Sequence, residues 1–185
     1  MKTPNKSRLL FFLPVFMLVL SISGCEKIKE AAEFDLYYNV PQAEVTIDST
    51  ILEFTDNETI MLQKSMVISF DSIKRKHDFD KVKSAKFDYI RLEVESPPGA
   101  NLNWINHLRA TISAEGLEET EVGVYNGDNG SKPTIDLELN DISVLPFILK
   151  EHITIRIYVR ASPPLPAPEV TLNLISRIRI TVQPI

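Results

Sequence analysis

Three histidines are the residues of this chain that could most directly support metal or nucleophilic chemistry. A zinc site needs several ligands that converge on one ion, and a nucleophilic site needs a histidine beside its nucleophile. His77, His107 and His152 are far apart in the sequence, and no two of them have the spacing that shares a helix face or alternate strand positions. We therefore expect no shared histidine site and no bound metal.

Glutamates gather around one glycine, where they could act as acids and bases. Glu115, Glu118, Glu119 and Glu121 surround Gly116, and paired carboxylates can hydrolyse glycosidic bonds. The segment lacks aromatic residues to line a sugar subsite, so a solvated hairpin end is the favoured interpretation. A hydrolase would need a cleft that brings acids such as Glu115 and Glu119 together with aromatic walls.

Acidic and amide side chains elsewhere could bind calcium. They lie in two stretches, which contain Asp71, Asp78, Asp80 and Asp88, and Asn126, Asp128 and Asn129. Neither stretch has ligands at alternate positions followed by a distant glutamate, as a calcium loop requires. We interpret them as turn chemistry, in which asparagine and glycine tolerate positive φ, and we expect no cofactor.

Trp104 and a proline run are two candidate binding features. Trp104, the only tryptophan, could stack on a sugar, but packing in a core is favoured because no second tryptophan completes a platform. The run 163–168 could be a polyproline II ligand, although a stiff connector between strands is favoured. No glycine-rich phosphate loop or serine elbow is present in the sequence, so no catalytic residue is assigned and the chain is not expected to be an enzyme.

The only cysteine, Cys25, follows an N-terminal leader. Lys2, Lys6 and Arg8 form a positively charged start, residues 9–20 are apolar and uncharged, and small residues precede Cys25. This layout is that of a secretory signal peptide. The apolar stretch is shorter than the roughly 20 residues that span a bilayer, which disfavours a lasting membrane helix.

The box Ile22-Ser23-Gly24-Cys25 resembles the bacterial lipoprotein signal. The resemblance implies that residues 1–24 are removed, that the thiol of Cys25 receives a diacylglycerol, and that the new amino group is acylated. Two or more acyl chains anchor a protein stably in a membrane. Glu26 stands where an aspartate would imply retention in the inner membrane, so the resemblance favours the outer membrane. A periplasmic-facing position is the default, and surface exposure stays open.

The composition of the mature chain limits the kinds of partner that it can bind. Removal of the leader takes away three of the 20 basic residues and none of the 25 acidic ones, which leaves 17 against 25 and a formal charge of −8. This charge argues against nucleic acid as a partner. With one cysteine, the chain cannot form an internal disulfide. Residues 25–33 are expected to be the lipidated cysteine and a short tether, and residues 34–185 a single domain.

Alternating apolar residues predict strands along most of 34–185. The expected strand segments are 34–40, 44–47, 51–54, 66–70, 89–94, 108–114, 122–124, 135–139, 153–159 and 170–182, the last with a bend or bulge near Ser176. Residues 71–84 predict short helical turns, and 140–150 a short helix capped by Asn140 or Asp141. About seven to nine strands with one or two short helices predict an antiparallel β-sandwich, immunoglobulin-like or a related Greek key. A closed barrel is the alternative.

The second half of the chain resembles small uncharacterised β-sandwich lipoproteins of Gram-negative envelopes. The resemblance rests on the order of Trp104-Ile105, the turn around Glu115-Gly116-Leu117, Ile135-Asp136-Leu137, a short helix and two terminal strands. It implies a compact domain without assigned catalysis, and it assigns no functional residue. We predict a membrane-anchored, non-catalytic binding or structural subunit with a membrane-associated protein partner. A glycan-, lipid- or peptidoglycan-binding module is the alternative, and a hydrolase is the third.

Overall fold

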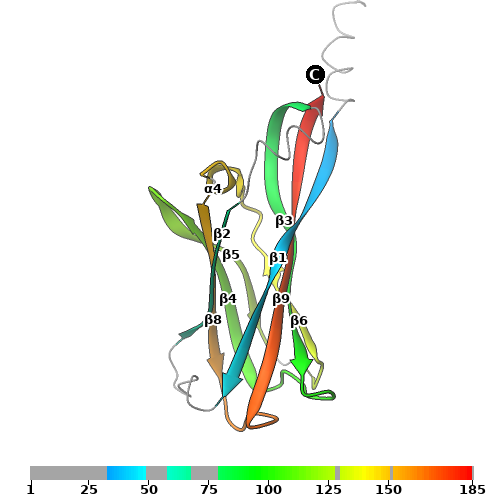
Figure 1. Ribbon diagram of the computed structural model, residues 1–185, viewed down its shortest axis with the longest axis vertical. Helices are drawn as coiled ribbons and strands as arrows, with labels where there is room; N and C mark the ends of the chain where they lie inside the picture. Colours follow the sequence, from blue (N-terminus) through cyan, green and yellow to red (C-terminus); the bar gives the residue numbers. More distant parts are fainter. Residues whose placement is uncertain (1–32, 49–57, 68–78, 128–129, 151, 185) are drawn as a thin grey trace, which may run out of the picture.

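The computed structural model describes residues 33–48, 58–67, 79–127, 130–150 and 152–184. Their strands pair in two antiparallel sheets that face each other (Figure 1). Sheet A has the order β1-β9-β3-β6, and sheet B has the order β2-β8-β4-β5-β7. The elements are β1 (Phe34–Asp48), β2 (Thr59–Val67), β3 (Phe79–Ser96), β4 (Ile105–Ala114), β5 (Leu117–Asn126), β6 (Thr134–Asp136), β7 (Glu138–Leu139), α4 (Leu145–Ile148), β8 (His152–Ala161) and β9 (Glu169–Pro184). The prediction of an antiparallel β-sandwich is confirmed.

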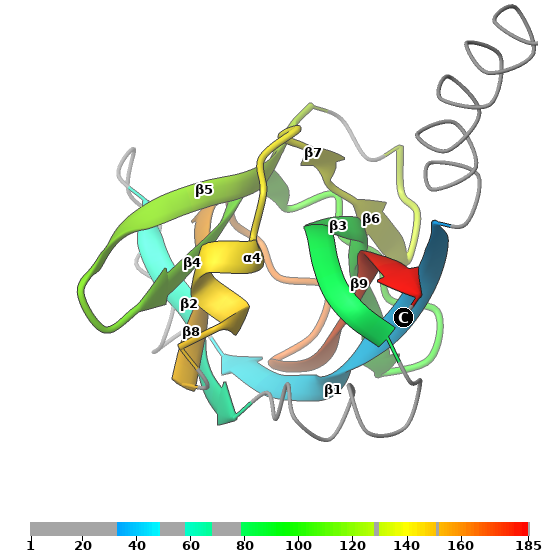
Figure 2. The same cartoon turned by 90° about the horizontal axis from the view of Figure 1, so that it is seen from above.

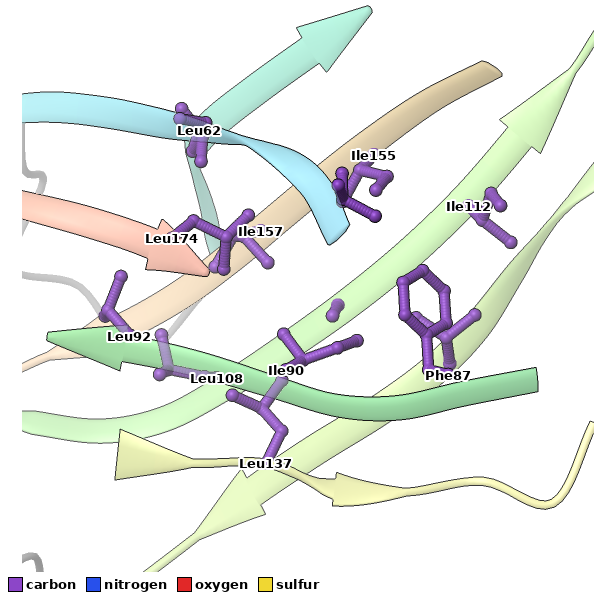
Figure 3. Close-up of a cluster of buried hydrophobic side chains, with 14 of the residues drawn as sticks. Leu62, Phe87, Ile90, Leu92, Leu108, Ile112, Leu137, Ile155, Ile157 and Leu174 are labelled. Carbon is purple, nitrogen blue, oxygen red and sulfur yellow. The ribbon is translucent and has the colours of Figure 1, made fainter. Parts of the chain in front are cut away.

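The two C-terminal strands show most directly how the sequence builds the core. Along β8, Ile153, Ile155, Ile157 and Val159 are 1–2% exposed, while the residues between them face outward. Such alternation places successive side chains on opposite faces of a strand. β9 repeats the pattern, with buried apolar residues at the even positions from Val170 to Val182, apart from the buried Ser176. The even face therefore packs inward, where Figure 3 shows side chains of both sheets meeting.

Irregular pairing occurs opposite Ser176, near the predicted bend of β9. Ser176 is 3% exposed, and both neighbouring strands change register close to it, β1 between Val40 and Ala43 and β3 between Phe87 and Tyr89. The extra residues therefore lie in the neighbours rather than in β9. Pro41 falls within the β1 irregularity, where an edge strand tolerates proline, so the two segments expected on either side of it form one strand.

Two local predictions are wrong. Residues 79–84 belong to β3 rather than to helical turns, and residues 71–78 lie outside the described residues. The segment 135–139 is not one strand, because β6 pairs with β3 in sheet A and β7 pairs with β5 in sheet B. The buried Leu137 lies where the chain crosses between the sheets, and alternation alone does not reveal such a change of sheet.

The short helix also differs from its prediction. It spans only Leu145–Ile148 and begins after Val144, which makes no side-chain cap, so neither Asn140 nor Asp141 caps it. Pro146 lies in its first turn, where the missing N–H costs little. Phe147 and Ile148 are buried. Burial of these two side chains, rather than capping, therefore holds the turn in place. The expected strand 51–54 and residues 68–70 lie outside the described residues.

Truncation of a core side chain should destabilise the sandwich far more than truncation of an exposed one. Leu172 is fully buried on the central strand β9, and such Leu→Ala changes cost about 2–5 kcal/mol. We expect Leu172→Ala to lower the unfolding free energy by that amount in urea titrations of the mature chain. Ile60→Ala, at a residue that is 53% exposed, should change it by less than about 1 kcal/mol. Equal losses of unfolding free energy in the two variants would contradict the described core.

Candidate functional site

Polar side chains on the outer face of sheet B form one connected network. Alternation on β8 and β4 places arginine, tyrosine, histidine and hydroxyl side chains outward, opposite the buried aliphatic residues. Residues from β2, from β5 and from the position before β2 complete the set. We call this set the sheet B network: Glu58, Gln63, His107, Arg109, Thr111, Ser113, Glu119, Asn126, Arg156 and Tyr158.

Glu58 joins two residues of β4 in one half of the network. Its Oε1 lies 2.7 Å from Nε2 of His107, and its Oε2 accepts hydrogen bonds from Nε and Nη2 of Arg109 at 3.0 and 2.7 Å. The other ring nitrogen of His107, Nδ1, lies 2.6 Å from Oδ1 of Asn126 on β5. Glu58 precedes β2, so these contacts tie that edge strand to β4 and β5.

Glu119 is the centre of the other half. Its Oε1 accepts hydrogen bonds from Oγ1 of Thr111 and from Oη of Tyr158, both at 2.7 Å. Its Oε2 accepts one from Nη1 of Arg156 at 2.7 Å. Arg156 also donates to Ser113 and to Gln63, both at 3.0 Å. This half therefore links strands β2, β4, β5 and β8.

An arginine stacked on a tyrosine joins the two halves. The guanidinium carbon of Arg109 lies 4.1 Å from the ring centroid of Tyr158, a distance typical of a cation–π contact. Arg109 holds Glu58, and Tyr158 donates to Glu119. Arg109 and Tyr158 are thus each held by a carboxylate and by each other, and the two halves form one connected arrangement.

The environment keeps both network carboxylates ionised. Hydrogen bonds from Arg109 lower the pKa of Glu58, against the opposing effect of burial, and the charges of Arg109 and His107 add to the lowering. For Glu119, burial acts to raise the pKa, but hydrogen bonds from Thr111 and Tyr158 and the charge of Arg156 outweigh it, so the pKa is lowered. The hydrogen bond to Glu119 raises the pKa of Tyr158.

Such carboxylates suit recognition better than proton transfer. A carboxyl group that acts as a general acid near neutral pH needs a raised pKa, and both of these are lowered. Their oxygens are also occupied by partners within the network. What the arrangement offers is a preorganised surface of hydrogen-bonding and charged groups.

A smaller cluster occupies the outer face of sheet A. Arg177 on β9 lies between Tyr37 on β1 and Tyr89 on β3, with its guanidinium carbon 4.8 and 5.0 Å from the two ring centroids. Its Nε donates to Asp88 at 2.8 Å. This hydrogen bond to Asp88 raises the pKa of Arg177. The cluster crosses three strands and engages the ring faces of both tyrosines.

The residues singled out in the sequence are dispersed in the structure. Trp104 is 2% exposed and packs in the core, and its Nε1 donates to the carbonyl of Asn101 at 3.0 Å, so a sugar cannot reach its ring in this conformation. Of the glutamates around Gly116, Glu119 belongs to the sheet B network, whereas Glu115 is exposed in the turn. No catalytic pair with aromatic walls is formed by these two among the described residues.

The two histidines that the structure describes do not converge. His107 lies in the sheet B network, His152 is the exposed first residue of β8, and His77 lies outside the described residues, as does the lipidation residue predicted at Cys25. Asn126 contacts His107, and Asp88 contacts Arg177. In the described ranges, no group of three or more histidine, cysteine, aspartate or glutamate residues could hold a metal ion.

Comparison with family models and with curated proteins adds no relative. No family model and no curated protein matches the chain. Across the part of the chain that the structure describes, no helix is long and apolar enough to cross a membrane.

Sequence reasoning missed most of the sheet B network. Glu58, Arg109, Arg156 and Tyr158 are not among the candidate residues identified from the sequence. The available signal was the alternation of β8 and β4, which put long hydrogen-bonding side chains at every second position of both strands. The pairing of His107 with Arg160 and of Thr111 with Arg156 brings those positions together, and the sequence does not specify that register.

Acid should weaken the fold through the network carboxylates. Because the folded pKa of Glu58 and Glu119 lies below the ordinary value of 4.5, their contribution to stability is present above pH 4.5 and is lost as the pH falls through the folded pKa. Partly exposed pairs contribute about 0–1 kcal/mol each. We expect the double variant Glu58→Gln/Glu119→Gln to have a lower urea midpoint at neutral pH and a flatter decline below about pH 4.5.

The matched control for this measurement is Glu169→Gln. Glu169 is exposed, and no ion pair holds it in the described ranges. Its replacement should leave both the midpoint and its acid dependence unchanged. An acid decline of the same steepness in the network variant and in the wild type would contradict the assigned role of the two carboxylates.

Proposed function

We propose that the protein is a lipid-anchored envelope lipoprotein whose sandwich is a non-catalytic binding or structural subunit of a membrane-associated protein complex. The observation that carries the binding role is the sheet B network, a preorganised face of arginine, tyrosine and carboxylate groups that crosses four strands. In this proposal, the protein partner docks on the outer face of sheet B.

The sequence supports attachment to a membrane. The leader and the box that ends at Cys25 resemble the lipoprotein signal, and Cys25 is the only thiol in the chain. We propose that lipid on Cys25 anchors the mature chain in the outer membrane, with the domain on the periplasmic side. The net negative charge of the mature chain agrees with a protein partner better than with nucleic acid.

The residue types of the sheet B network suit a protein interface. Arginine and tyrosine are enriched among the residues that dominate binding energy. Ordering of long side chains opposes association, and the hydrogen bonds of Arg109, Arg156 and Tyr158 already fix these side chains in the free protein. A partner with complementary charges could therefore dock with a small further loss of side-chain freedom.

Co-purification with variants of this face tests the proposal. The full chain with its own leader would be expressed in its native envelope, crosslinked and purified, and partners would be identified by mass spectrometry. We expect a reproducible membrane-associated protein whose recovery falls about tenfold or more when Arg156 and Tyr158 are both changed to alanine, because interface residues of this kind contribute 2 kcal/mol or more.

The matched control is Arg91→Ala on the opposite sheet. Arg91 makes a two-point ion pair with Asp136 on the outer face of sheet A, so its loss removes a comparable surface contact far from the proposed interface. Recovery should be retained in this variant. Equal recovery from all variants would refute docking through sheet B, and specific binding of a purified glycan that Arg156→Ala abolishes would replace the protein partner with a glycan.

A further inference from the structure

Large apolar side chains are exposed at the end of the sandwich where the chain enters. Phe34, Val67 and Leu149 are 38%, 59% and 56% exposed. Phe34 is the first residue of β1, and Val67 is the last residue of β2, opposite His152 at the start of β8. Leu149 directly follows α4. We call this end, with these three residues, the entry end.

The views of the molecule show that this end is oblique. In Figure 1, the end of β9 and the starts of β3 and β1 form the highest part of the described sandwich, and α4 with the start of β8 lies lower on the opposite sheet. Seen from above in Figure 2, α4 and the start of β1 both face the viewer. Phe34 on sheet A and Leu149 and Val67 on sheet B therefore lie toward the same, oblique end of the sandwich.

The entering chain is fixed at this same end. Glu33 forms an ion pair with Lys83 of β3, so the position of the chain is defined immediately before β1. Cys25 precedes Glu33 by eight residues, and such a segment spans at most about 26–29 Å. β9 has 16 residues and is therefore about 50 Å long. A lipid on Cys25 can consequently reach only the entry half of the domain.

The charges at the entry end are compatible with a lipid surface. Lys83 and Lys86 pair with Glu33 and Asp141, and Lys150 follows Leu149 directly. Aromatic and aliphatic side chains flanked by lysines are favoured at the headgroup region, where apolar atoms leave water while ammonium groups stay hydrated.

We propose that the entry end faces the bilayer that holds the lipid of Cys25, with Phe34, Val67 and Leu149 on the side of the domain turned toward the headgroups. This contact rests on the proposed lipid anchor. It gives the anchored domain a fixed tilt, which leaves the outer face of sheet B open beside the membrane and points the start of β9 away from it.

Site-specific labelling tests this contact in the lipidated protein. The full chain would be produced with its leader, purified and reconstituted in vesicles of phosphatidylethanolamine and phosphatidylglycerol. Because the thiol of Cys25 is blocked by lipid, a second cysteine can be labelled selectively with an environment-sensitive fluorophore. The test positions are Phe34→Cys, Val67→Cys and Leu149→Cys. The controls are Ile60→Cys, which is 53% exposed near the opposite end of β2, and Glu169→Cys at the start of β9.

Quenching by nitroxide lipids decides the outcome, and flotation of the vesicles reports the anchor separately. We expect every variant to float and quenching to be severalfold stronger at the three test positions than at Ile60 and Glu169. If the variants float but quenching is equal at all positions or absent from the test positions, the contact is refuted while the anchor stands. If the protein does not float, the proposed anchor fails, and the contact fails with it.

Discussion

The pairing of β9 on both sides is the constraint on which the rest of the sandwich depends. β9 runs antiparallel to β1 and to β3 along nearly its whole length, and its even positions are buried from Val170 to Val182. The chain has one cysteine and so cannot be crosslinked internally. Backbone pairing at this central strand and packing of its inner face must therefore hold sheet A together and provide the surface against which sheet B packs.

The alternation that builds the core also determines the two outer faces. A strand with a buried aliphatic residue at every second position must present the intervening residues to solvent. On β8 these are Thr154, Arg156, Tyr158 and Arg160, and on β9 Arg177 stacks between two tyrosines. Arg109 and Arg156 on the outer face of sheet B and Arg177 on that of sheet A are held by ion pairs or aromatic contacts. Each face is therefore a defined chemical surface, and the sheet B network is the larger of the two.

Strong local patterns were predictable, whereas long-range pairing was not. The period of two along 153–159 and 170–182 was sufficient to predict β8 and β9 and the sandwich class. The change of sheet at Leu137 was missed, because a buried residue between two sheets has the same local pattern as a residue within one strand. A bend or bulge is predicted within 170–182 near Ser176, but the irregularities lie in the neighbouring strands β1 and β3. The sequence does not decide this, since the extra residue of a bulge can lie on either partner.

The sheet B network was even less predictable, because its residues come from several strands. Glu119 was recognised as part of an acidic turn, but its partners Thr111, Arg156 and Tyr158 come from other strands. Only the register of β4 with β5 and β8 brings them together. A residue such as Glu58, whose partners lie about 50 positions away, has no local signal of its role.

We propose that lipid on Cys25, the only cysteine of the chain, holds this sandwich at one end. Mass spectrometry of the N-terminal peptide from the full chain, produced with its own leader in a Gram-negative host, tests this anchor. We expect a mature chain that begins at Cys25 and carries a diacylglycerol on the thiol, and we expect the leader to remain uncleaved when Cys25 is changed to serine. A free thiol at Cys25, or a mature N-terminus at another residue, would refute the anchor.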